Sequence, residues 1–198
     1  MPPPRAGSVA LLALSLIALG ACNYAAPRYS VSVENVTMLR GLRRRPIGVG
    51  KFVAKPMSGG ASVPCRAGGQ INTPDGEPFS QYVRAALISE LEMAEAYSAS
   101  APVTLTGTLD HVDSNSLAGT WTIALTVASS NGRSIAVEEK YSFGSSFAAD
   151  VACPQTAQAL MPAVQNVIAK LVHDPGFAAL VDDAETSQVN DAPKGTRP

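Results

Sequence analysis

The stretch "GTWTIALTV", residues 119–127, carries the clearest secondary-structure pattern in the sequence. Large apolar side chains alternate with small or polar ones along its whole length, and β-branched and aromatic residues dominate it. A period of two predicts a β-strand that buries one face and leaves the other in water, as in an antiparallel sheet. The inward set is expected to be Trp121, Ile123, Leu125 and Val127, opposite Thr120, Thr122, Ala124 and Thr126.

Two similar runs flank this strand, "VTLTGTLDHV" at 103–112 and "SIAVEEKYSF" at 134–143. Asn131-Gly132 lies between the second and third runs, and both residues tolerate positive φ, which favours a tight hairpin. We therefore expect a three-stranded antiparallel meander. Its other inward residues are expected to be Val103, Leu105, Leu109, Ile135, Val137, Tyr141 and Phe143.

Apolar residues at steps of three and four predict two amphipathic helices, at 79–98 and at 154–173. Pro162 lies inside the second helix and is expected to kink or weaken it, because proline has no N–H to donate and clashes with the preceding turn.

The region before the first helix is expected to hold one strand and one long loop. "RPIGVGKFVAKP" predicts a strand over 46–56 with Ile47, Val49, Lys51 and Val53 on one side. Residues 57–78 are rich in Gly, Pro and Ser, show neither period, and predict a long surface loop that suits binding or a disulfide.

The expected order is strand, helix, three strands, helix. It predicts a two-layer α+β sandwich with a small mixed sheet and two helices on one face. The 198 residues suit one domain, which we expect over 46–181, followed by a disordered polar tail at 182–198.

The chain has a net charge of −1, and 16% of its residues are charged. Broad capture of nucleic acid is therefore not expected.

The leader "MPPPR", followed by a short apolar run, is typical of a secretory signal peptide over residues 1–21. Its end, "LIALGAC" at 16–22, resembles the lipobox of bacterial lipoproteins, with Leu19, Gly20 and Ala21 before Cys22. The resemblance implies cleavage before Cys22 and three acyl chains on that residue. The alternative is an ordinary cleaved leader, or an uncleaved helix, with Cys22 present by chance.

Asn23 stands where, in enteric lipoproteins, an aspartate would favour the inner membrane. The resemblance therefore implies the periplasmic face of the outer membrane. Residues 22–45 are expected to form the lipid anchor and a linker, in which "YSVSVENV" at 29–36 suggests a weak edge strand.

Cys65 and Cys153 remain in the mature chain. An exported protein meets an oxidising compartment, so we expect these two cysteines to form a disulfide. Two separate buried thiols are the alternative.

Four arginines gather at 40–45, namely Arg40, Arg43, Arg44 and Arg45. Such a cluster is able to contact anionic headgroups or peptidoglycan. A solvated basic loop is the alternative.

Catalytic candidates are weak throughout the sequence. His111 lies beside Asp110 and Asp113, but no second metal-binding motif accompanies them, and His173 suits the C-terminus of a helix. No Gly-x-Ser-x-Gly motif or phosphate-binding loop occurs. We expect no enzymatic activity, no cofactor and no metal.

The leader, the segments "RPIGVGKFVA" and "FSQYVRAALISEL", the strand pair and the closing helix together resemble small outer-membrane lipoproteins of the YajG-like type. They are also similar to activator lipoproteins of penicillin-binding proteins and to auxiliary lipoproteins of lipid-transport systems. The resemblance implies a non-enzymatic binding or scaffold module for a cell-envelope protein. The alternative is a lipid- or glycan-binding auxiliary lipoprotein of an envelope transport system.

Overall fold

The structure is a computed structural model that describes residues 22–66 and 69–183. Its main sheet has the order β2-β5-β6-β7, in which β5, β6 and β7 form the expected antiparallel meander and β2 pairs in parallel with β5. The α+β class and the mixed sheet are thereby confirmed. The strands are β2 (Gly48–Ala54), β5 (Thr104–Asn115), β6 (Thr120–Ser129) and β7 (Ser134–Ser142).

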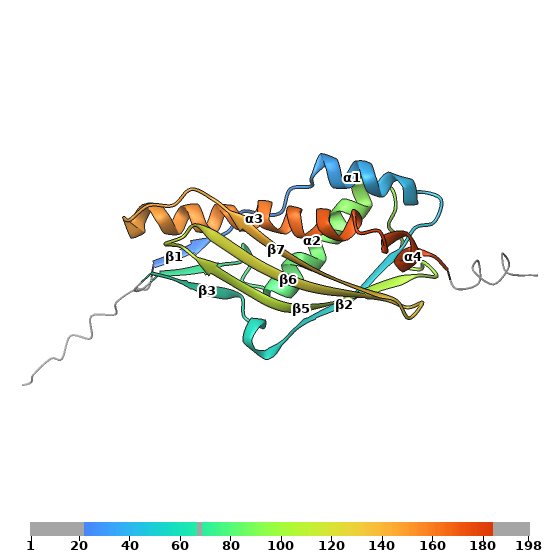
Figure 1. Cartoon of the computed structure of the whole chain (residues 1–198), viewed down its shortest axis with the longest axis horizontal. Helices are drawn as coiled ribbons and strands as arrows, with labels where there is room; N and C mark the ends of the chain where they lie inside the picture. Colours follow the sequence, from blue (N-terminus) through green and yellow to red (C-terminus); the bar gives the residue numbers. More distant parts are fainter. Residues whose placement is uncertain (1–21, 67–68, 184–198) are drawn as a thin grey trace, which may run out of the picture.

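Two helices cover one face of this sheet (Figure 1). Helix α2 (Phe79–Met93) contacts β2 and β5, and α3 (Ala149–Val172) contacts β6 and β7. Trp121 is fully buried between these layers, where its indole Nε1 donates to the Thr156 carbonyl at 2.8 Å and its ring meets the Phe79 ring at an angle of 60°. The inward residues expected for β6 are all buried.

Helix α3 starts five residues earlier than expected and contains both Pro154 and Pro162. Each proline lacks the N–H that a helix interior needs. The helix nevertheless continues through Pro162, because Val164, Val167 and Leu171 beyond it are buried in the core. A short helix, α4 (Phe177–Val181), follows α3.

Part of the expected surface loop at 57–78 has regular structure, so that prediction is wrong in part. It contains the 3₁₀ turn Pro56–Ser58, β3 (Ser62–Cys65) and β4 (Gly69–Asn72), which pair in antiparallel. β1 (Cys22–Ala25) pairs in parallel with β4 and completes a second, three-stranded sheet. Strands of four residues are too short for their alternation to stand out among Gly and Pro.

Residues 22–45 are not a linker, and the edge strand expected at 29–36 is wrong. This segment holds β1, α1 (Val33–Leu39) and a 3₁₀ turn at Arg40–Leu42, with Ser32 as the N-cap of α1. Val36 and Leu39, three residues apart, are buried, and α1 contacts both α2 and α3. The folded body therefore includes β1 and α1 instead of starting at residue 46. The expected signal peptide and most of the expected tail lie outside the described residues.

Bulges shift the expected side-chain directions in two strands. In β2 the pairing register changes between Val49 and Phe52, which places Phe52 in the core and leaves Val53 exposed. In β5 the register changes between Leu109 and His111. An extra residue on one strand turns the following side chains to the opposite face, so simple alternation assigned Val53 to the wrong side.

Gly107 makes room for Phe52 on the neighbouring strand. A Cβ atom at Gly107 would lie 2.5 Å from the Phe52 ring, which is itself buried. We expect Gly107→Ala to lower the free energy of unfolding by about 1–3 kcal/mol, since the ring has to move within a packed core. Urea titration of Gly144→Ala provides the control, because nothing lies within 4 Å of the Cβ added there. Equal stability of the two variants would contradict this account.

Candidate functional site

Cys22, the expected lipidation site, is the first residue of β1 and is exposed. It lies opposite Gly69 in the register of β1 and β4. Gly69 in turn is tightly enclosed, because a Cβ there would lie 3.2 Å from the Tyr24 ring and 3.5 Å from Cys153 Sγ. The sheet that carries Cys22 is thus packed directly against α3. We call the end of the molecule that holds β1, β3, β4 and the first part of α3 the Cys22 pole.

The expected disulfide between Cys65 and Cys153 is confirmed, and both residues are buried. It joins the end of β3 to the first part of α3, with 88 residues of separation along the chain. The covalent link therefore fixes the small sheet, including the strand that carries Cys22, to the main body.

Arg66 holds two loops at the Cys22 pole, although the sequence offers no motif that singles it out. Its guanidinium donates to Ser116 Oγ at 3.1 Å, to the Ser116 carbonyl at 3.0 Å and to the Phe147 carbonyl at 3.3 Å. It also donates to the Ser146 carbonyl. These bonds tie the β5–β6 turn to the segment that leads into α3.

The arginine cluster lies at the opposite end from Cys22. Arg45 lines a cavity together with Phe177 and Val181 of α4, and β1 and α4 lie at opposite ends of the long axis (Figure 1). Arg43 pairs with Glu95 at 2.8 Å and Arg45 pairs with Asp182. Nearness in sequence to Cys22 does not bring the cluster near it in space. We call the end of the molecule that holds the arginine cluster and α4 the α4 pole.

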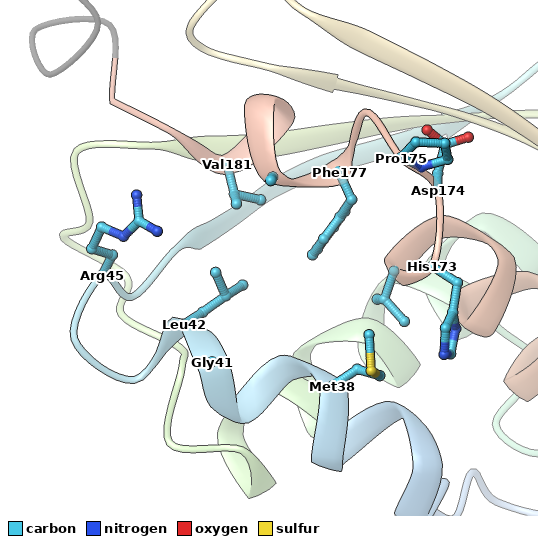
Figure 2. Close-up of a pocket in the computed structure, with 11 residues that line it drawn as sticks. Met38, Gly41, Leu42, Arg45, His173, Asp174, Pro175, Phe177 and Val181 are labelled. Carbon is cyan, nitrogen blue, oxygen red and sulfur yellow. The ribbon is translucent and has the colours of Figure 1, made fainter. Parts of the chain in front are cut away.

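The α4 pole contains an apolar groove of about 380 Å³ between α1, the end of α3 and α4. Met38, Leu42, Phe177 and Val181 turn toward the hollow, with Arg45 and His173 at its rim (Figure 2). A second cavity of about 300 Å³ adjoins it and shares Arg45 and Val181. The second cavity adds Arg44, Pro46, Pro102, Val103 and Asp183 to the lining.

The face of the main sheet that α2 and α3 do not cover is rich in threonine. At each edge of the sheet a long basic side chain bonds to a strand carbonyl: Arg84 Nε donates to the Gly50 carbonyl at 2.6 Å, and Lys170 Nζ donates to the Glu138 carbonyl at 2.6 Å. Polar side chains that satisfy edge carbonyls protect a sheet against addition of another strand. Residues pointing from this face include Thr104, Thr106, Thr108, Thr120, Thr122, Ala124 and Thr126.

Asp110 makes structural contacts on this face. It accepts from Lys55 Nζ at 2.8 Å and from Thr126 Oγ1 at 2.7 Å, whereas His111 and Asp113 are exposed. Burial acts to raise the pKa of Asp110, but the bonds from Lys55 and Thr126 lower that pKa below its ordinary value. Over residues 22–66 and 69–183, no group of three or more His, Cys, Asp or Glu side chains has the arrangement of a metal site.

The lowered pKa of Asp110 predicts a pH dependence of stability. The carboxylate contributes to folding above the pKa of the unfolded chain, about 4, and this contribution is lost as pH falls through the lower folded value. We expect the parent protein to be more stable than Asp110→Asn near neutral pH and the difference to shrink in acid. Urea titrations at a series of pH values check this, and a difference independent of pH would contradict it.

A buried carboxylate that the sequence did not single out joins the N-terminal segment to α2. Glu90 is fully buried, and its Oε1 accepts from Tyr29 OH at 2.6 Å, from the Ser32 amide at 2.8 Å and from Asn35 Nδ2 at 3.3 Å. Asn35 Nδ2 also donates to the Gln165 carbonyl of α3 at 3.0 Å. Burial and the bond to Glu90 raise the pKa of Tyr29. This cluster fastens residues 29–35 to both covering helices.

In residues 22–66 and 69–183 no helix combines the length and apolar character needed to cross a bilayer.

His173 lies at the C-terminus of α3, as expected, and its Nδ1 lies 2.8 Å from the Ala169 carbonyl.

Comparison with protein-family models gives no match, and comparison with curated proteins gives none either. Among solved structures, the chain is similar to the crystal structure of protein XCC0632 from Xanthomonas campestris, described with the family model DUF330. The two are 14% identical, with a TM-score of 0.49, and the match covers 76% of this chain and 94% of that one. A similarity at this level supports no conclusion on function, which has to be drawn from the residues themselves.

Proposed function

We propose that the chain is a lipoprotein, held through an acylated Cys22 at the periplasmic face of the outer membrane. In this role it acts as a non-enzymatic docking module for another cell-envelope protein. The observation that supports the proposal is the place of Cys22 inside β1, opposite Gly69. A lipid on a strand residue would hold the folded body directly at the bilayer, because no flexible linker separates the two.

The α4 pole is the docking surface in this proposal. It lies at the far end of the long axis from Cys22, so an anchored molecule can present it away from the bilayer (Figure 1). The groove there has an apolar lining, and charges of both signs flank the two cavities, namely Arg44 and Arg45 together with Asp174 and Asp183. A partner segment with apolar anchor residues fits this groove, since apolar burial supplies affinity and the charges of both signs favour one orientation of the partner.

Photo-crosslinking in cells tests the docking role. A benzophenone amino acid replaces Met38, which lines the groove and is 48% exposed, or Met57, which is 94% exposed and outside the groove. We expect a defined protein adduct from position 38 and none from position 57. Equal adducts from both positions, or no adduct from position 38, would contradict the proposal.

A second candidate function is lipid binding for transport between membranes. The groove of about 380 Å³ falls in the usual size range of small-ligand sites and has an apolar lining. It lies between helices and not between the sheet and its covering helices. In the same crosslinking experiment, a lipid adduct at position 38 in place of a protein adduct would favour this second function.

A further inference from the structure

Two loops at the Cys22 pole expose large apolar side chains and contain no charged residue. The turn 116–119 reads "SLAG" and the segment 143–149 reads "FGSSFAA". Phe147 is 97% exposed and Leu117 is 67% exposed. Exposed apolar residues that occur singly need no explanation, whereas neighbouring ones indicate an interaction surface.

Phe147 and Leu117 are neighbours in space. Together with Ser145 and Ser146 they line one small hollow of about 100 Å³. The Phe143 amide donates to the Gly119 carbonyl at 2.8 Å, and Ser145 Oγ donates to the Ser116 carbonyl. The two loops therefore form one unit, which we call the apolar tip.

A short series of contacts connects the apolar tip to the strand that carries Cys22. Arg66 donates to carbonyls of both loops and directly follows Cys65 in the chain. Cys65 is bonded to Cys153, and Cys153 Sγ lies 3.5 Å from the position of a Cβ on Gly69, the register partner of Cys22. Four segments distant in sequence thus meet at one end of the molecule.

From this geometry we propose that the apolar tip inserts into the bilayer that holds Cys22. Phe147 and Leu117 enter the interfacial region beside the acyl chains. This inference rests on the proposed anchor, and it adds an orientation: with a second point of contact the long axis points away from the membrane. Residues 116–119 and 143–149 carry no charge, and the two charged residues next to them, Arg66 and Asp150, are of opposite sign. Insertion is therefore expected into zwitterionic phospholipid and does not require an anionic surface.

Fluorescence quenching by lipid measures this insertion. The full chain, as cells export it, is mixed with phosphatidylcholine vesicles whose acyl chains carry bromine, with Phe147→Trp as the probe. The matched control is Val33→Trp, since Val33 is 81% exposed on α1, outside the tip. The fully buried Trp121 is common to both variants, and its signal is subtracted using the parent protein.

We expect several-fold stronger quenching for Phe147→Trp than for Val33→Trp. Equal quenching in protein that stays bound to the vesicles would overturn the insertion and leave the anchor intact. If instead the parent chain remains in the aqueous phase, as a Cys22→Ser variant should, the anchor itself fails. The two failures are therefore distinguishable.

Discussion

Removing the Cys65–Cys153 disulfide is expected to lower the free energy of unfolding by about 4–5 kcal/mol, from the loop-closure entropy of a long cross-linked segment. The cross-link spans 88 residues and lies inside the core, so it restricts a large part of the unfolded chain. Urea titration of the parent and of a Cys65→Ala, Cys153→Ala double variant measures the difference. A second titration of the parent in reductant checks that the loss comes from the covalent bond.

The loss of the disulfide is also expected to be uneven across the molecule. β1, β3 and β4 form a sheet of short strands that the disulfide joins to α3, whereas β5, β6 and β7 are long and paired throughout. Amide hydrogen exchange should therefore speed up first in the small sheet. A Cys22→Ser variant, which keeps the disulfide, is the control. An unchanged urea midpoint after reduction would contradict the role given to this bond.

Glu90→Ala is expected to lower the free energy of unfolding by about 3–5 kcal/mol. It removes the shared acceptor of the half-buried Tyr29 and Ser32 and of the buried Asn35, and it opens a cavity in the core. Each donor left without an acceptor costs about 1–3 kcal/mol, and the cavity adds to this loss. Glu90→Gln should lose much less, because its carbonyl oxygen can accept from the same donors. Thermal and urea unfolding of the two variants measure the difference.

Glu92→Ala is the matched control for Glu90→Ala, since Glu92 lies on the same helix and is exposed. We expect its stability to stay close to that of the parent. A similar loss at both positions would show that the buried cluster does not fasten residues 29–35. The same holds if Glu90→Gln proves as damaging as Glu90→Ala.

The parts of the fold that the sequence predicted are those with long, regular patterns. The meander follows from alternation sustained over about ten residues in each strand, and α2 and α3 follow from apolar residues at steps of three and four. These patterns were sufficient for the α+β class and for the side of the sheet that is covered. The disulfide followed from the two cysteines, Cys65 and Cys153, that remain once Cys22 is assigned to the anchor.

The remaining features depend on contacts between segments distant in sequence. α1 has only seven residues, and its fixing contact, Glu90, lies 55 residues beyond Asn35. β1 and β4 have four residues each and pair across 47 positions. A bulge reversed the side of Val53 without any mark in the local sequence. Likewise, only the folded chain separates the arginine cluster from Cys22 and connects Phe147, through Arg66 and the disulfide, to the sheet that carries Cys22.

The most direct test of the proposed function is the mass of the protein extracted from the membranes of cells that express the full chain. We predict a chain that begins at Cys22 and carries a diacylglycerol on the sulfur and an acyl chain on the amino group. A free thiol at Cys22, or an intact leader on protein in the cytosol, would contradict the anchor and with it the orientation proposed for both poles.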